Sequence, residues 1–385
     1  MNRLDHALAG FDEAPIFTIH SFCQRTLKDR AFESGALFDT ELITDEANLF
    51  QDVADDYWRK RFYESGPLPV AFALKNRLHP EKFLPLLREH SRHPLIKYVS
   101  RVEGRELDAL IVDLEKAFAA ARSSWLKSKD TIVALANPAA GWAKGDHKKL
   151  EIFAERMAQA DACFESVAPT LDSLTAMEFF SRREIREDTN AKSESPAHEF
   201  FDLCDVLCDR ECDFLAGLKL DFVDFACAEL PRRKRQLKAQ SYGDLLTSLH
   251  AALDAAGGDS LVREVRAKYQ AALIDEFQDT DPVQYQIFRR LFSDPEPDRK
   301  TEARAENFLF LIGDPKQAIY GFRGADIFTY LDAASRVDRC FTLEQNWRSE
   351  TPLVRAVNTV FGAAQSPFVF DEIHFQPVQI GRAHV

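Results

Sequence analysis

The chain has 385 residues, of which 45% are hydrophobic and 29% are charged, and its 49 basic and 62 acidic residues give a net charge of −13. This length and composition predict a soluble globular protein of two or three domains, and they exclude a small disulfide scaffold, a fibrous repeat and wholesale disorder. The excess of acidic residues excludes a globally basic nucleic-acid binder. It does not exclude a local basic surface that binds nucleic acid.

The seven cysteines are scattered and include no CxxC pair, which predicts reduced thiols and a cytoplasmic protein. The first fifteen residues, MNRLDHALAGFDEAP, contain no apolar core of a signal peptide. No stretch approaches the roughly 18 uninterrupted apolar residues of a membrane span. We therefore expect no secretion signal and no membrane partner.

Taken in chain order, residues 15–19 (PIFTI) predict a short strand, followed by a turn and a helix. Residues 45–235 show the apolar spacing of successive helices, for example at Leu49, Phe50, Val53, Tyr57 and Phe62, and at Leu107, Leu110, Ile111, Leu114, Phe118 and Trp125. Residues 181–199 are polar and predict a mobile loop. From about residue 241, helices alternate with short apolar strands, which indicates a parallel α/β sheet.

The segment AALIDEFQDTD, residues 271–281, is an apolar strand followed directly by acidic residues. Carboxylates at the carboxyl end of a parallel strand lie where open α/β sheets bind ligands. In a nucleotide hydrolase the first acid holds Mg²⁺ and a neighbouring acid orients and deprotonates the attacking water, and Asp275 and Glu276 suit these roles. The simpler alternative is that these acids cap a helix that begins near Pro282. Capping explains Asp281 but not the two carboxylates directly after the strand.

A second apolar strand, residues 308–312, leads into GDPKQAIYGFRGA, residues 313–325. The neutral amide of Gln317 can donate to a phosphate oxygen and accept from water, as a sensor of the terminal phosphate must. Tyr320, Phe322 and Arg323 interleave aromatic rings with a cation, which is typical of a stacking platform for single-stranded nucleic acid. Packing of these rings in the core is the alternative.

A third strand, residues 340–343 (CFTL), is expected before LEQNWRS, residues 343–349. Arg348 can reach a γ-phosphate while the indole of Trp347 covers a purine ring. Alone, this segment also fits a buried ion pair for Arg348 and a core position for Trp347.

In order and spacing, these three segments resemble motifs II, III and IV of the superfamily 1 DNA helicases of the UvrD, Rep and PcrA type. The earlier TIHSFCQRTL, residues 18–27, is similar to the family's motif Ib, and QSYGDLL, residues 240–246, to the element that follows its helical insertion. Within the family, FTIHSFCQR and GDPKQAIYGFRGADIFTY are most similar to the RecB type.

The resemblance implies an α/β fold, namely an incomplete RecA-like P-loop NTPase sheet (helicase domain 1A) interrupted by a large all-α insertion (domain 1B). It places domain 1A at residues 1–44 and 236–362, domain 1B at 45–235, and a truncated start of domain 2A at 363–385. It also implies an ATP-dependent DNA helicase or translocase with ATP and Mg²⁺ as cofactors. A RecB-type helicase-nuclease (exodeoxyribonuclease V) acts on single-stranded and duplex-end DNA in double-strand break repair and recombination, with RecC-like and RecD-like subunits.

Carried over residue by residue, the resemblance makes Asp275 and Glu276 the Mg²⁺ carboxylates and Glu276 also the catalytic base. Gln317 would couple the phosphate state to DNA, Trp347 would stack on adenine and Arg348 would contact the γ-phosphate. The residues implied to line the single-strand track are Thr18, His20, Phe22, Tyr320, Phe322 and Arg323.

The sequence departs from the family because it contains no GxxxxGK[ST] loop, so a phosphate cradle, its lysine and a hydroxyl ligand of Mg²⁺ are missing. The family places that loop before the first motif found here, and motifs V and VI, with a RecB-type nuclease domain, after residue 363. We therefore expect a fragment without useful ATPase activity alone.

Two other functions stay open: a non-catalytic single-stranded DNA-binding remnant, and a metal-dependent nuclease built on Asp275, Glu276 and Asp279. Two further features have two interpretations each. Cys204, Cys208 and Cys212 recur every four residues and fit core packing better than a metal site. The basic run at 231–238 (PRRKRQLK) fits either contact with DNA phosphates or a solvated helix face.

Overall fold

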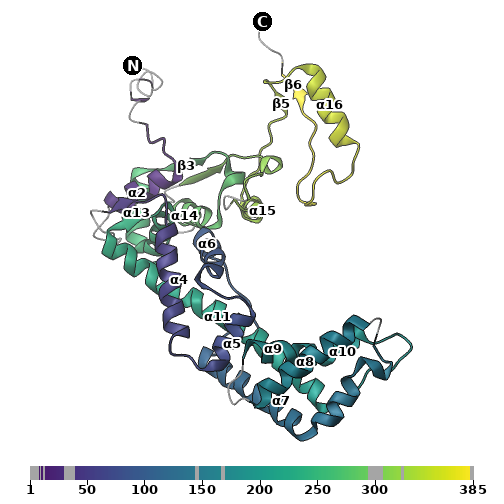
Figure 1. The fold of residues 1–385 in the computed structure, drawn as a ribbon. Helices are drawn as coiled ribbons and strands as arrows, with labels where there is room; N and C mark the ends of the chain where they lie inside the picture. The colour runs from purple at the N-terminus through teal and green to yellow at the C-terminus, as the bar shows by residue number, and fades with distance from the viewer. Residues whose placement is uncertain are drawn as a thin grey trace. The chain divides into compact units, whose positions relative to one another are not determined.

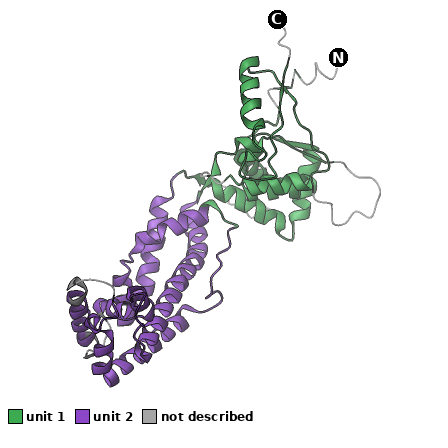
Figure 2. Cartoon of the chain, turned by 90° about the vertical axis from the view of Figure 1, so that its right-hand side faces the viewer, with its two compact units in different colours: residues 1–44, 92–95, 240–385 green, residues 45–91, 96–239 purple. Residues whose placement is uncertain are grey.

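The computed structural model describes residues 8, 10, 11, 14–29, 40–143, 147–165, 170–293, 307–321 and 325–381. Figures 1 and 2 show that the chain divides into two compact units. Unit 1 comprises residues 1–44, 92–95 and 240–385, and unit 2 comprises residues 45–91 and 96–239. Residues 363–381, expected to begin a further domain, are grouped with unit 1.

Unit 2 is built from helices throughout the part that the structure describes. Its α-helices are α4 (Ala47–Phe62), α5 (Pro67–Lys75), α6 (Leu84–Arg92), α7 (Leu107–Ala136), α8 (His147–Glu165), α9 (Leu171–Phe179), α10 (Arg182–Asp188) and α11 (Glu199–Leu237), and its short 3-10 helices are η2 (Pro80–Lys82) and η3 (Pro138–Ala140). No helix within the described ranges is long and apolar enough to cross a membrane.

The two longest helices, α7 and α11, pack along one another and form the centre of unit 2. Trp125 of α7 is buried with its ring centroid 5.2 Å from Phe200 of α11, 5.4 Å from Phe164 and 5.6 Å from Phe180. The predicted apolar stripes are confirmed, since all their members are buried except Ile111, which is half-buried. Aromatic pairs of this kind stabilise a core by more than the apolar area that they bury would predict.

The expected loop at 181–199 is wrong for its first part, because α10 occupies residues 182–188. The side-chain oxygen of Ser181 accepts a hydrogen bond from the Glu184 backbone N–H (3.3 Å), and Ile185 is buried. The capping serine, the single buried side chain of Ile185, and the ion pairs of Arg182 and Arg183 with Asp202 and Asp209 hold this two-turn helix against α11, although its sequence is polar.

Unit 1 mixes helices with short strands. Its helices are α2 (Ile19–Asp29), α12 (Tyr242–Asp254), α13 (Gly258–Lys268), α14 (Pro282–Phe292), α15 (Ile327–Arg336), α16 (Thr351–Gly362), η4 (Phe277–Asp279) and η5 (Pro315–Gln317). The chain leaves unit 1 after β1 (Glu41–Leu42) and returns near β2 (Ala239–Gln240), and its other strands are β3 (Ala271–Ile274), β4 (Phe308–Leu311), β5 (Gln345–Asn346) and β6 (Gln379–Ile380).

Helix starts in unit 1 follow their capping residues. Ser241 and Asp244 form a reciprocal capping box at the start of α12. Asp281 accepts a hydrogen bond from the Gln284 N–H (2.9 Å) at the start of α14, and Pro282 occupies the first helical position. The cap predicted for Asp281 is therefore present.

The sheet of unit 1 is smaller than predicted. β3 and β4 are parallel, as expected, with Ala271 paired to Phe308 and Ile274 to Leu311. The predicted third strand at 340–343 is wrong: that segment carries no strand, and the next strand, β5, pairs instead with β6 in a separate two-stranded parallel sheet. Phe341 and Leu343 are 84% and 89% exposed, so no burial fixes an extended backbone there.

The predicted strand at residues 15–19 is also wrong, because residues 14–18 are irregular and α2 begins at Ile19. Ile16 is exposed, and a strand requires a neighbouring strand that accepts its backbone hydrogen bonds. The helix predicted after it is confirmed by α2.

Candidate functional site

The acidic segment and the glycine-rich segment leave the sheet at the same edge. β3 and β4 are parallel and in register, so residues 275–279 and residues 313–317 follow the two strands side by side. The Ile312 N–H donates to the Ile274 carbonyl (2.8 Å), and the Phe277 N–H donates to the Ile312 carbonyl (2.9 Å). We call these two stretches, 275–279 and 313–317, the carboxyl edge.

Asp275 and Glu276 are exposed at the first turn of this edge. The backbone of Glu276 has a φ of 50°, a left-handed conformation that is unfavourable for a residue with a side chain. The Glu276 N–H donates to Asp275 Oδ1 (3.0 Å), which holds this turn. The strained turn directs two consecutive carboxylates out of the sheet, where a ligand can reach them.

Gln278 lies beneath them and is 2% exposed. Its Nε2 donates to Glu276 Oε2 (2.7 Å), and its Oε1 accepts from the Asp314 N–H (3.0 Å). Both ends of the buried amide are thereby satisfied. Gln278 could not be recognised from the sequence, because a polar residue between Phe277 and Asp279 gives no signal of burial.

Gly313 permits the close contact between the two stretches. A Cβ at this position would lie 2.6 Å from Gln278 Oε1 and 3.1 Å from the backbone nitrogens of Gln278 and Phe277. No residue with a side chain fits there without displacing the backbone of η4. The signal for this role was a single glycine directly after an apolar strand.

Asp314 organises the second stretch of the carboxyl edge. Its carboxylate accepts from Gln317 Nε2 (3.2 Å) and pairs with Lys316 Nζ (2.7 Å). Burial acts to raise the pKa of the Asp314 carboxyl, but the hydrogen bonds from Lys316 and Gln317 outweigh it and leave the pKa below its ordinary value. Gln317 is exposed, so its amide is tied to Asp314 while its side chain faces solvent.

The donor set at Asp275 and Glu276 fits a hard divalent cation. Among the described residues, one oxygen of each carboxylate has no protein partner. Next to them, Asp279 Oδ1 is buried without a hydrogen bond from the described part of the chain. Burial, together with the Glu276 carboxylate, raises the pKa of Asp279. Mg²⁺ is commonly held by one or two carboxylates with phosphates and water completing its shell.

Two of the residues predicted for the DNA track, Thr18 and His20, lie at the start of α2 and are at least partly exposed. Thr18 is exposed at the start of the helix, where its Oγ1 accepts from the Ser21 N–H (3.2 Å). His20 is half-buried, with its ring edge-on to Tyr242 at 5.4 Å. Burial lowers the pKa of His20, against an opposing effect of Asp281.

Phe22 was predicted to line the track, and the structure corrects this. Its ring is buried in the core of unit 1, stacked on Phe288 at 5.3 Å and edge-on to Tyr269 at 6.1 Å. The spacing of Phe22, Cys23, Thr26 and Leu27, all buried on one side of α2, is the helical signal that could have placed it.

Tyr320 is exposed just after the carboxyl edge. Phe322 and Arg323, predicted to form the stacking platform with it, lie outside the described residues.

Trp347 and Arg348 follow β5 in the small β5–α16–β6 region. The indole of Trp347 is 62% exposed, and a Cβ on Gly381 would clash with its ring carbons, so Gly381 packs directly against the ring. Arg348 is exposed, and its N–H donates to Asn346 Oδ1 (2.9 Å). In the described part of the chain, no hydrogen bond, ion pair or ring contact joins either residue to the carboxyl edge.

The comparison with known families decides the class of this protein. The model of the UvrD/REP helicase N-terminal domain matches residues 1–338. The chain belongs to the UvrD/REP helicase family.

Among curated relatives, the RecB subunit of the RecBCD enzyme of Escherichia coli is 34% identical over 380 residues, covering 96% of this chain and 30% of the relative. The RecB subunit of Haemophilus influenzae is 32% identical over 419 residues, covering 100% of the chain and 33% of the relative. That of Mycobacterium tuberculosis is 46% identical over 153 residues, 40% of the chain and 13% of the relative. The chain therefore spans about a third of the length of the relatives that it matches throughout.

The basic run at the end of α11 is largely engaged in ion pairs within this helicase-family chain. Arg232 pairs with Glu229, Arg233 pairs with Asp56 and Glu229, and Lys234 pairs with Glu46. Arg233 and Lys234 are mostly buried at these pairs. The structure favours a stabilising role for these two residues over contact with DNA phosphates.

The structure supports neither a metal site at Cys204, Cys208 and Cys212 nor the nuclease alternative. Cys204 is buried, with Sγ 3.8 Å from Met177 Sδ, whereas Cys212 is exposed. Within the described ranges, no three Cys, His, Asp or Glu side chains gather to hold a metal, so Asp275, Glu276 and Asp279 do not form a three-carboxylate centre.

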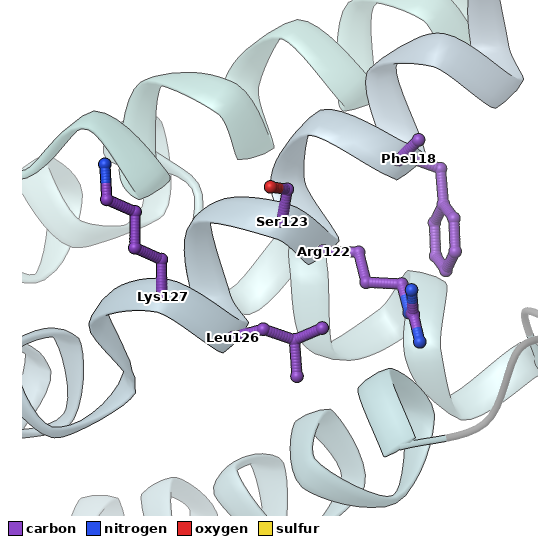
Figure 3. A pocket seen from close by; sticks show the side chains of 6 residues that line it. Phe118, Arg122, Ser123, Leu126 and Lys127 are labelled. Carbon is purple, nitrogen blue, oxygen red and sulfur yellow. The ribbon is translucent and has the colours of Figure 1, made fainter.

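A hollow of about 510 Å³ lies along α7 in unit 2, lined by Phe118, Ala119, Arg122, Ser123, Leu126 and Lys127. Figure 3 shows that the labelled side chains project from this one helix. Arg122 is engaged, since its Nε donates to the Phe164 carbonyl (3.1 Å). None of the predicted site residues lines this hollow.

Proposed function

We propose that this chain is the motor part of an ATP-dependent DNA helicase or translocase of the RecB type. The observation that carries the proposal is the carboxyl edge, which joins the Asp275–Glu276 pair to the Gly313–Gln317 loop in a chain of the UvrD/REP family. The proposed protein acts on single-stranded and duplex-end DNA in the cytoplasm, in double-strand break repair and recombination, with RecC-like and RecD-like subunits. The similarity of the chain to RecB subunits of RecBCD enzymes supports this.

In this proposal Asp275 and Glu276 hold Mg²⁺, which supplies charge neutralisation for the phosphates when it is bound. Glu276 also orients and accepts a proton from the attacking water through its outward carboxylate oxygen. Gln317 contacts the terminal phosphate through its exposed amide. Because its Nε2 is bonded to Asp314 without nucleotide, we expect that bond to be exchanged when phosphate is present.

In the proposed complex, Trp347 stacks on the adenine ring and Arg348 contacts the γ-phosphate. Gly381 covers one side of the Trp347 indole, and the 62% exposure of the ring leaves surface for a purine. The guanidinium of Arg348 is exposed and has the fork geometry that suits phosphate.

The proposed single-strand track uses Thr18, His20 and Tyr320, with Phe322 and Arg323. Exposure of Thr18 and Tyr320 supports their part, and the ring of Tyr320 offers a face for base stacking. We assign unit 1 as far as residue 362 to an incomplete RecA-like domain 1A, unit 2 to the helical domain 1B, and the part of unit 1 after residue 362 to the start of domain 2A.

One observation favours a second function, a non-catalytic strand-binding remnant: no GxxxxGK[ST] loop occurs in these 385 residues. The backbone cradle and lysine that normally hold the phosphates are absent from the chain.

We expect steady-state ATP hydrolysis by the isolated chain with single-stranded DNA and Mg²⁺ to stay at background, because half of the phosphate-binding groups are missing. The Glu276→Gln variant, assayed beside it, should have the same rate. Turnover that Glu276→Gln abolishes would show that this chain alone is an ATPase.

Binding of a labelled oligothymidine, followed by fluorescence anisotropy, tests the single-strand track. Tyr320→Ala should weaken this binding about fivefold to 100-fold, because a stacking ring is lost. Tyr63→Ala, which removes an exposed ring of unit 2, is the control and should leave the affinity unchanged.

A further inference from the structure

We propose that Gln278 is a positioning residue that couples the Glu276 carboxylate to the Asp314–Gln317 loop. The inference rests on the proposed function, which gives Glu276 and Gln317 their roles toward water and phosphate. It adds a physical connection between them: Glu276, Gln278, Asp314 and Gln317 form one continuous chain of hydrogen bonds.

The orientation of the Gln278 amide is determined by its partners. An ionised carboxylate can only accept, and a backbone N–H can only donate. The Nε2 group must therefore face Glu276 Oε2 (2.7 Å) and the Oε1 atom must face the Asp314 N–H (3.0 Å). Reversing the amide would break both bonds in a site that is 2% exposed, where lost hydrogen bonds are not replaced by water.

The contact is also sterically tight. Gly313 leaves no space for a Cβ against Gln278, so the loop cannot slide over the amide without moving it. A displacement of Asp314 toward a ligand therefore pulls on the Gln278 Oε1 atom and, through the rigid planar amide, on the Glu276 carboxylate. Phosphate contact at Gln317 would reach Glu276 by this route.

The coupling can be measured without nucleotide, through exchange of the Asp314 amide hydrogen resolved by mass spectrometry with electron-transfer fragmentation. Glu276 does not contact Asp314, yet Glu276→Ala should speed exchange at Asp314 about fivefold, as expected when a supporting hydrogen bond is lost. Glu276→Gln, which keeps an acceptor for Gln278 Nε2, should restore the slow rate. Asp338→Ala is the control, because it removes an exposed carboxylate after α15 that bonds neither to Gln278 nor to Asp314, and it should leave the rate unchanged.

In a Gln278→Leu background the relay is absent, so exchange at Asp314 should be fast and Glu276→Ala should add nothing to it. Gln286→Leu in α14, which removes an amide bonded to His250, controls for the loss of a glutamine in unit 1. Equal effects of Glu276→Ala and Asp338→Ala, or an undiminished effect of Glu276→Ala when it is combined with Gln278→Leu, would overturn the proposal.

Failure of the proposed function is distinct, since it would appear as absence of divalent-cation binding while the Asp314 coupling persists.

Discussion

Replacing Lys75 by methionine is expected to lower the free energy of unfolding of unit 2 by about 3 to 5 kcal/mol. Lys75 is 12% exposed, and its Nζ lies 2.7 Å from Glu211 Oε2 and 3.1 Å from the more exposed Glu178. Without the ammonium group, Glu211 would be a buried carboxylate with no cation. Urea denaturation, followed by tryptophan fluorescence, measures the loss, since three of the four tryptophans, Trp58, Trp125 and Trp142, lie in unit 2.

The same variant should depend on pH in a defined direction. Burial raises the pKa of Glu211 above its ordinary value, and Lys75 partly opposes this. A group with a raised folded pKa stabilises the fold below its unfolded pKa and loses that contribution as the pH rises through the folded value. In Lys75→Met the folded pKa rises further, so the loss of stability should be largest at alkaline pH, where Glu211 is ionised, and should shrink as the pH falls toward the ordinary pKa range of a carboxyl group.

Two controls define this prediction. Lys75→Met with Glu211→Gln should recover most of the stability, because no buried charge remains. Lys116→Met on α7 removes an exposed lysine 3.9 Å from Asp113 and should change the stability by less than about 1 kcal/mol. Equal, small effects of Lys75→Met and Lys116→Met would contradict a role for the buried pair.

Gly313→Ala is expected to destabilise unit 1 by about 1 to 3 kcal/mol, the usual cost of forcing an extra methyl group into a packed site. The new methyl would meet Gln278 Oε1 at 2.6 Å and two backbone nitrogens at 3.1 Å. Backbone atoms cannot move away as a flexible side chain can, so the carboxyl edge must open. Thermal unfolding, together with hydrogen exchange over residues 307–317, would measure both effects.

Gly321→Ala is the control for this substitution, since no atom of the described residues lies within 4 Å of a Cβ on Gly321. It should leave both the unfolding temperature and exchange over 307–317 nearly unchanged. If Gly313→Ala behaved like Gly321→Ala, the two stretches of the carboxyl edge would not be in the close contact described above.

The helices of unit 2 and the β3–β4 pair were predictable because their signals are local. Apolar spacing of three to four residues marks α4 and α7, and an apolar run that ends in acids marks β3. The strands predicted at 15–19 and 340–343 failed because composition indicates a propensity for extended structure but does not reveal whether a neighbouring strand is present.

The details of the candidate site depend on contacts that are distant in sequence. Gln278 is buried only because β4 brings Gly313 against it. The basic run seemed available for DNA because its carboxylate partners, Glu46 and Asp56, lie far upstream, at and within α4. Phe22 lies in the core because it shares the helical spacing of Cys23, Thr26 and Leu27 on the buried side of α2.

We propose that Asp275 and Glu276 form a divalent-cation site at the carboxyl edge. The most direct test is a titration of the chain with Mn²⁺, a paramagnetic substitute for Mg²⁺, in which free and bound ion are distinguished by electron paramagnetic resonance. We predict that Asp275→Asn and Glu276→Gln each weaken Mn²⁺ binding by at least about tenfold, while Asp338→Asn, on an exposed aspartate after α15, does not. Equal Mn²⁺ affinity in all three variants and the original chain would contradict the account.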